Sequence, residues 1–180
     1  YSMDKPKLRP AEADAMYAGI LVDTDNFVTK TGVRTFEAAS FLRKNGADMT
    51  RVRKAYRSDL DSYRQIAQGV ARAEIYLESF AISDMPTEGV DSPTVLAAKV
   101  ANDLLDIDDV RASFVMTKID NTVYVSARSI DDVNVQVIME KFGGGGHGTV
   151  AGAQIEDKSI DEVKQDIRDL LLTMNTDGEI

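Results

Sequence analysis

The feature that most constrains the fold is a run of four glycines at residues 143–146, followed at once by His147. Glycine loses more conformational entropy on folding than other residues, so a folded chain keeps such a run where the backbone must approach another group or adopt positive φ angles. Curled glycine amides also form anion-binding concavities. The run therefore predicts a phosphate-binding loop whose polar side chain is His147, the only histidine in the sequence.

A flexible linker is the alternative explanation of this run. Linkers usually mix glycine with Ser, Thr or Pro and lie between domains, whereas this run lies between the apolar segments 137–139 and 150–151. No Gly-Lys-Ser or Gly-Lys-Thr follows it, which excludes a Walker loop, and the strand that a dinucleotide-binding fingerprint needs is not evident. Nearby, Ser126 and Arg128 end a strand-like segment, and Asn134 begins a helix-like one.

The charge of the chain is acidic and unevenly distributed. The net charge of -9 argues against general wrapping of nucleic-acid phosphates, so no extended nucleic acid is expected as a partner. The residues through Arg72 carry 13 basic against 9 acidic side chains, and the remainder carries 8 against 21, which indicates two units. The absence of cysteine fits a cytoplasmic protein, and we expect a soluble chain because no apolar run approaches the length of about 18 residues that spans a membrane.

The first third of the sequence is predicted to be helical. Helices are expected over residues 11–22, 35–45 and 51–57, and a longer helix from residue 58 or 59 to about 77 is expected to connect two units. Asp23 directly follows the first apolar helix. Its carboxylate either caps the next turn of the chain or acts as a ligand at the buried base of a binding site. Local reasoning favours the cap.

The rest of the sequence predicts a small α/β domain with the order βαββαβα. Strands are expected over 79–84, 111–118, 122–128 and 153–155, with a hairpin turn at Asp120-Asn121. Helices are expected over 93–105, over 134–141 and from Ser159 onward, where apolar residues recur at helical spacing.

Several motifs resemble one family. Segments 125–129, 134–139 and 142–147 resemble the DHHA1 domain of the DHH phosphoesterase superfamily, and segments 18–24 and 31–39 resemble the last motif of its catalytic DHH domain. The branch most similar to this sequence is the bacterial cyclic-di-AMP phosphodiesterases with PAS, degenerate GGDEF and DHH/DHHA1 modules. The resemblance implies a C-terminal part of the DHH domain at 1–57, a connecting helix at 58–78 and a mixed-sheet DHHA1 substrate-binding domain at 79–180.

The resemblance also implies a function and a set of site residues. It implies phosphodiester hydrolysis of cyclic di-AMP or a short linear dinucleotide with two manganese ions, for which Asp23 becomes a metal ligand rather than a cap. The residues implied to hold the substrate are Ser126, Arg128, Asn134, Gly144, Gly145, Gly146 and His147. His147 is also the implied catalytic residue, and the sequence does not separate binding of phosphate from stabilisation of transition-state charge.

The sequence departs from the superfamily because it lacks the Asp-His-His motif and the earlier metal-binding motif. We therefore expect the chain alone to hold manganese incompletely and to be inactive. Its expected partners are the N-terminal remainder of a membrane-anchored parent protein and a second copy of the chain. NanoRNA or phospho-adenosine phosphatases and exonucleases of the same superfamily remain alternatives. A non-catalytic nucleotide- or RNA-binding module, as in alanyl-tRNA synthetases, is an alternative of another class, disfavoured by the acidic second half.

Overall fold

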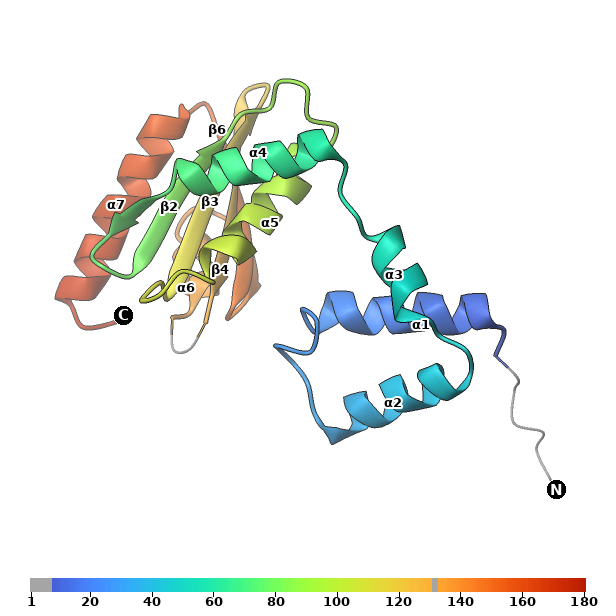
Figure 1. Ribbon diagram of the computed structural model, residues 1–180. Coiled ribbons are helices and arrows are strands. Elements are labelled where there is room, and N and C mark those ends of the chain that lie inside the picture. The colour runs from blue at the N-terminus through green and yellow to red at the C-terminus, as the bar shows by residue number, and fades with distance from the viewer. Residues whose placement is uncertain (1–7, 131–132) are drawn as a thin grey trace. The chain divides into compact units, whose positions relative to one another are not determined.

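The computed structural model describes residues 8–130 and 133–180, and the chain divides into two compact units at Ser58 and Asp59 (Figure 1). The first unit holds the helices α1 (Pro10–Asp23), α2 (Val33–Lys44) and α3 (Met49–Ala55). The three helices expected in this part of the sequence are thereby confirmed. Their small core consists of Ala13, Tyr17, Ala39, Leu42 and Ala47.

Local capping and one long-range ion pair hold α1 and α3 together in the first unit. Asp48 is the N-cap of α3, and its carboxylate accepts a hydrogen bond from the Arg51 amide at 2.9 Å. The Arg51 guanidinium donates in turn to Asp14 on α1 at 2.6 Å, and this contact lowers the pKa of Asp14.

The second unit is built on one mixed sheet of six strands in the order β1-β2-β3-β4-β6-β5. The strands β2 and β3 run parallel, and every other neighbouring pair is antiparallel. The elements in chain order are α4 (Leu60–Ala71), β1 (Glu74–Tyr76), β2 (Phe80–Met85), α5 (Pro93–Leu104), β3 (Ala112–Ile119), β4 (Thr122–Ser129), α6 (Val135–Glu140), β5 (Gly145–His147), β6 (Val150–Glu156) and α7 (Ile160–Thr176). The expected α/β class with a mixed sheet is confirmed.

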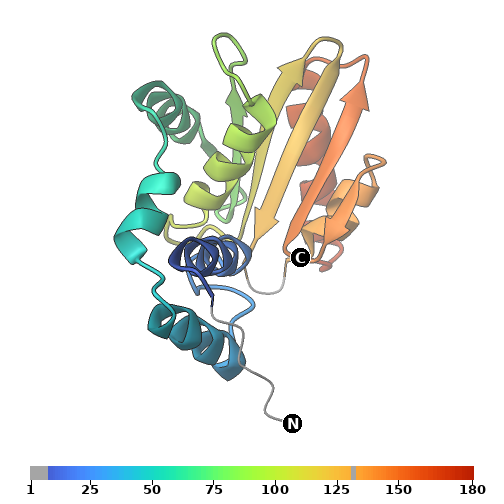
Figure 2. The same cartoon turned by 90° about the vertical axis from the view of Figure 1, so that its right-hand side faces the viewer.

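The two faces of this sheet are covered to different extents. On one face, α6 and α7 pack over a large core in which Phe114, Ile138 and Ile167 are completely buried. On the other face, α4 and α5 cover β2 and β3 through residues such as Val100 and Val115. Figure 2 shows α7 behind the sheet and α5 in front of it. The half-buried and exposed residues of β4, β6 and β5 on the α5 side therefore form an open face.

The bounds of three predicted segments were wrong. The helix expected to reach residue 77 ends at Ala71, because Leu77 and Glu78 adopt positive φ angles and turn β1 back onto β2. This helix also packs on α5 and the sheet, and it belongs to the second unit. Two of the four glycines of the predicted loop belong to the edge strand β5. The strand expected at 153–155 begins earlier, at Val150, because its first residues pair with β5.

Among the described residues, no helix is both long and apolar enough to cross a membrane.

Candidate ligand-binding face

The strand β4 separates the buried core from the open face through its alternating side chains. Val123, Val125 and Ala127 are buried in the core beneath α6 and α7. The alternating residues Tyr124, Ser126 and Arg128 are only half-buried, because they point to the face that α5 covers in part. Two of the predicted site residues, Ser126 and Arg128, therefore share one surface.

Strand register places the glycine run beside these two residues. Arg128 lies opposite Val150 of β6, and Val150 lies opposite His147 of β5, so the three form a row across the sheet. Strands lie about 4.8 Å apart, which puts the Cα atoms of Arg128 and His147 roughly 10 Å from each other. We call these three residues the Arg128 row.

A second row runs parallel to the first. Ser126 lies opposite Gly152, and Gly152 lies opposite Gly145. Two of its three members have no side chain, so this row leaves a flat floor on the open face. The register thus brings the serine, the arginine, the glycine run and the histidine of the sequence prediction onto one surface.

Arg128 is the principal charge on this surface. Its guanidinium donates one hydrogen bond, from Nη1 to the Ala127 carbonyl oxygen at 2.9 Å. A guanidinium has five N–H donors, and no carboxylate pairs with Arg128 among the residues that the structure describes. Burial lowers the pKa of Arg128, yet an arginine keeps its charge at neutral pH. A half-buried cation with unused donors is suited to bind an anion.

The structure explains the glycines of the run in different ways. Gly143 has a φ of +73°, which only glycine adopts readily. A Cβ on Gly144 would lie 2.1 Å from the Gly152 carbonyl oxygen, and one on Gly146 would lie 2.3 Å from the Val150 carbonyl oxygen. A Cβ on Gly145 would meet nothing within 4 Å. The close approach of β5 to β6 thus explains Gly144 and Gly146, but the fold does not require Gly145 to be glycine.

The backbone amides of this run are partly engaged. The Gly144 amide donates to the Met139 carbonyl oxygen at 2.9 Å, and the Gly143 amide donates to the Glu140 carbonyl oxygen at 3.1 Å. These bonds close the end of α6. The Gly144 amide is therefore not free to donate to a phosphate. Gly144 affects the surface by letting the backbone approach Gly152 closely.

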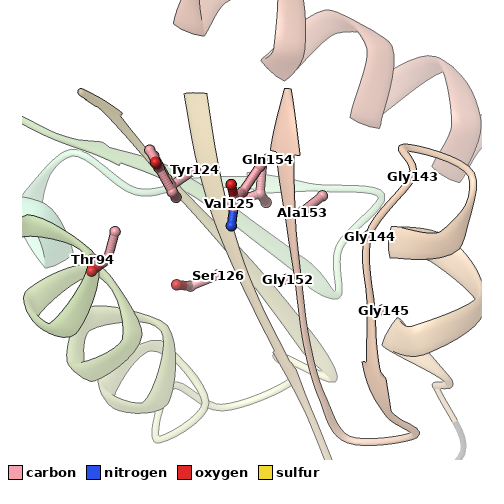
Figure 3. Close-up of a pocket in the computed structure, with 10 residues that line it drawn as sticks. All are labelled: Thr94, Tyr124, Val125, Ser126, Gly143, Gly144, Gly145, Gly152, Ala153 and Gln154. Carbon is pink, nitrogen blue, oxygen red and sulfur yellow. The ribbon is translucent and has the colours of Figure 1, made fainter. Parts of the chain in front are cut away.

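A pocket of about 490 Å³ opens beside the second row (Figure 3). Its floor and walls come from β4, β5, β6 and the first turn of α5. The residues that line it are Thr94, Tyr124, Val125, Ser126, Gly143, Gly144, Gly145, Gly152, Ala153 and Gln154. None of them carries a charge, so the pocket suits an uncharged part of a ligand.

His147 and Asn134 lie outside this pocket. The side chain of His147 is exposed and has no hydrogen bond or ion pair within the described part of the chain. Asn134 is the N-cap of α6, and its side-chain oxygen accepts from the amides of Gln136 at 3.1 Å and Val137 at 3.4 Å. Because Val135 donates its amide to the Gly148 carbonyl oxygen at 2.8 Å, this cap lies next to the turn that follows His147.

Asp23 lies in the first unit, at the last position of α1, and its side chain is exposed. The capping role that local reasoning favoured belongs to the next residue, because Thr24 accepts a hydrogen bond from the Phe27 amide at 3.0 Å. The described residues contain no cluster of three or more histidine, cysteine, aspartate or glutamate side chains that could hold a metal ion. They do not fit a two-metal centre by themselves.

Sequence reasoning missed three side chains of the pocket. Tyr124 could have been found from the alternation of β4, since it has the same parity as Ser126 and Arg128. Gln154 lay in the strand expected at 153–155 but was not selected. Thr94 had no signal in the sequence, because the position of α5 against β4 is set by tertiary packing.

The chain is similar to known proteins over most of its length. A family model described as "DHHA1 domain" matches residues 79–173. The chain is 45% identical over 172 residues to the "Cyclic-di-AMP phosphodiesterase GdpP" of Geobacillus thermodenitrificans, covering 95% of this chain and 26% of that protein. It is 42% identical over 168 residues to the "Cyclic-di-AMP phosphodiesterase PdeA" of Listeria monocytogenes, covering 93% and 25%. It thus spans about a quarter of the length of these relatives.

A solved structure shares the fold. The crystal structure of an exopolyphosphatase-related protein from Bacteroides fragilis matches with a TM-score of 0.77 at 20% identity, covering 89% of this chain and 50% of that one. At this identity the likeness concerns the fold alone.

Proposed function

Because this chain belongs to the DHHA1 domain family, we propose that it is the substrate-binding part of a metal-dependent phosphodiesterase that hydrolyses cyclic di-AMP or the linear dinucleotide. The names of the two relatives above support this substrate class. In this proposal the open face of β4, β6 and β5 receives the substrate, and Arg128 and His147 contact its phosphate.

The observation that carries the proposal is the half-buried Arg128, which has no described carboxylate partner. A phosphodiester is an anion with two non-bridging oxygens, and the planar guanidinium can donate to both of them. His147 lies in the same row and can donate a ring N–H to a phosphate oxygen from the other side. Ser126 and the free surface at Gly145 lie beside this contact.

The metal chemistry is proposed for the longer protein. In the longer protein a pair of divalent ions, manganese in this proposal, would supply Lewis-acid chemistry for phosphodiester hydrolysis. Asp23 would contribute one ligand, and residues outside this chain would contribute the others. The described residues of this chain bind and orient the substrate in this scheme. We expect incubation of the chain with cyclic di-AMP and Mn²⁺ to give no hydrolysis, and turnover of about 1 s⁻¹ or more would contradict this division of roles.

Binding of dinucleotides to this chain tests the proposal directly. Isothermal titration of cyclic di-AMP and linear di-adenylate should show binding that Arg128→Ala weakens by roughly ten- to a hundred-fold, since a hydrogen bond to a charged group contributes about 1.5–3 kcal/mol. Arg128→Lys should give an intermediate affinity, because a lysine lacks the planar fork. Arg64→Ala is the matched control, since Arg64 is exposed on α4 and pairs only with Asp61 among the described residues.

The histidine has its own test. His147→Ala should weaken dinucleotide binding and leave the melting temperature unchanged, because the side chain is exposed. A sharp fall in melting temperature with unchanged binding would make His147 a structural residue. Unchanged affinity in both Arg128→Ala and His147→Ala would refute the proposed phosphate contact.

A further inference from the structure

The pocket beside the second row has a chemical character different from that of the Arg128 row. It is lined by ten residues without a charge, whereas the row two residues further along the strands carries a half-buried cation and a histidine. Two residues of a β-strand span about 7 Å, so the second row lies about 7 Å from the Arg128 row, and Tyr124 and Gln154 lie about 13 Å from it. A ligand with one anionic end and one neutral end would therefore place its anion at Arg128 and its neutral group in the pocket.

The polar groups of the pocket fit a planar ring with hydrogen-bonding edges. Tyr124 and Gln154 lie opposite each other on β4 and β6, and Figure 3 shows both on the surface that Thr94 faces from α5. The Tyr124 ring offers an aromatic surface for stacking. The Gln154 carboxamide offers one acceptor and two donor hydrogens, and no hydrogen bond engages it within the described residues.

We propose that this pocket is a nucleobase subsite and that Gln154 makes it prefer adenine to guanine. This inference rests on the proposed function, since it takes the phosphate of the same ligand to lie at Arg128. A glutamine carboxamide pairs with adenine at two points, because its oxygen accepts from N6 and its NH₂ donates to N7. Guanine presents acceptors at both O6 and N7, so the carboxamide oxygen would face a second acceptor.

The glycine at position 145 supports this assignment. A side chain there would be tolerated by the fold, because a Cβ would meet no atom within 4 Å. Its absence leaves the floor of the pocket flat beside Gly152. This flat floor lies one row along the strands from the Tyr124 ring and the Gln154 carboxamide, and it leaves room for a planar purine beside them.

The test compares three probes on the 180-residue chain: adenosine monophosphate, guanosine monophosphate and inorganic phosphate. The parent chain should bind the adenine nucleotide about ten-fold more tightly than the guanine nucleotide. Gln154→Ala should abolish this preference and leave the affinity for inorganic phosphate unchanged. Gln68→Ala is the matched control, because Gln68 is exposed on α4 and does not line the pocket, and it should retain the preference.

Tyr124 provides a second measurement. Tyr124→Leu should weaken both nucleotides several-fold and keep their ratio, whereas Tyr124→Phe should retain the parent affinities, because stacking needs the ring and not the hydroxyl. Equal affinities of the two nucleotides for the parent chain, or a preference that survives Gln154→Ala, would overturn the nucleobase subsite.

The failure of this inference is distinguishable from failure of the proposed function. If Arg128→Ala weakens phosphate and both nucleotides while the two nucleotides bind the parent equally, only the nucleobase subsite is refuted. If no nucleotide binds, or Arg128→Ala changes nothing, both proposals are refuted.

Discussion

The two faces of the sheet differ in whether a charged side chain has a partner of opposite charge among the described residues. On the face covered by α7, the carboxylate of Asp84 pairs with Lys164 at 2.5 Å and with Arg72 at 3.0 Å. On the open face, the guanidinium of Arg128 has only a backbone carbonyl as a described partner. A half-buried charge without a counterion costs stability, and in the proposed function the phosphate of the ligand supplies the opposite charge.

The same contrast exists within the single strand β4. Its odd-numbered residues Val123, Val125 and Ala127 fill the core, and its even-numbered residues Tyr124, Ser126 and Arg128 face outward. In the proposed function, one set of alternate residues of this strand stabilises the core and the other set contacts the ligand. Substitutions on the two faces should have separable effects, and this separation can be measured.

The largest effect is expected at Gly144. Gly144→Ala places a Cβ 2.1 Å from the Gly152 carbonyl oxygen, which forces β5 away from β6 and should cost about 3 kcal/mol or more of unfolding free energy. Gly145→Ala meets no atom within 4 Å, so its unfolding free energy should stay within about 0.5 kcal/mol of the parent value. Its methyl group should instead weaken dinucleotide binding. Urea denaturation and titration measure both quantities, and equal stability of the two variants would contradict the assignment.

The next comparison uses neighbouring residues of β4. Val125→Ala removes buried methyl groups and should lower the unfolding free energy by about 2 kcal/mol. Ser126→Ala should change it by less than about 0.5 kcal/mol, because Ser126 is half-buried and no described group bonds to its hydroxyl. Dinucleotide affinity should show the reverse order at equal folded fractions. Equal losses of stability would mean that the open face is also part of the core.

Asp84 tests the closed face through its pH dependence. Burial raises the pKa of Asp84, but the hydrogen bonds and charges of Lys164 and Arg72 outweigh burial and lower it overall. A carboxyl with a lowered folded pKa stabilises the protein above its unfolded pKa of about 3.9, and this contribution is lost as the pH falls through the folded value. Asp84→Asn should therefore cost about 1–2 kcal/mol at pH 7.

The melting temperatures of the parent and Asp84→Asn should converge as the pH falls below about 4. A gap that stays constant from pH 7 to pH 3 would show that the loss has another origin than the charge of Asp84. Ser83→Ala offers no such pH dependence, since the Ser83 hydroxyl donates to the Gly69 carbonyl oxygen and does not titrate.

The smallest change in stability is expected at Asn134. This side chain caps α6, and the family resemblance implies that it also contacts the ligand. Asn134→Ala should cost about 1 kcal/mol, because α6 loses its N-cap. Asn134→Asp should keep this stability, since aspartate caps equally well, and should weaken dinucleotide binding by adding a negative charge near the phosphate. Unchanged binding in Asn134→Asp would leave the residue with the capping role alone.

The sequence by itself determined those parts of the molecule that depend on neighbours along the chain. The helices expected to start at Asn134 and Ser159 do start there, and each of these residues is the N-cap, because a cap bonds amides two or three residues away. The last helix buries its periodic residues, including Val163, Ile167 and Leu171, because a helical repeat is a local property. The DHHA1 resemblance, carried by short motifs, is confirmed by the family match.

Tertiary structure alone decided how these parts meet. The pairing of β5 with β6 turned a predicted loop into a strand and gave Gly144 and Gly146 their steric reason, whereas Gly145 was left open. Packing of α5 against β4 brought Thr94 within the pocket that Gln154 lines from another strand. Thr94, Tyr124 and Gln154 are tens of residues apart in the sequence, and β5 and β6 are close in sequence but belong to a sheet whose other strands are distant. The geometry of both sets of contacts therefore depends on the whole core rather than on local propensity. For this reason the sequence could indicate candidate residues for phosphate binding, but only the fold could show the neutral pocket beside them.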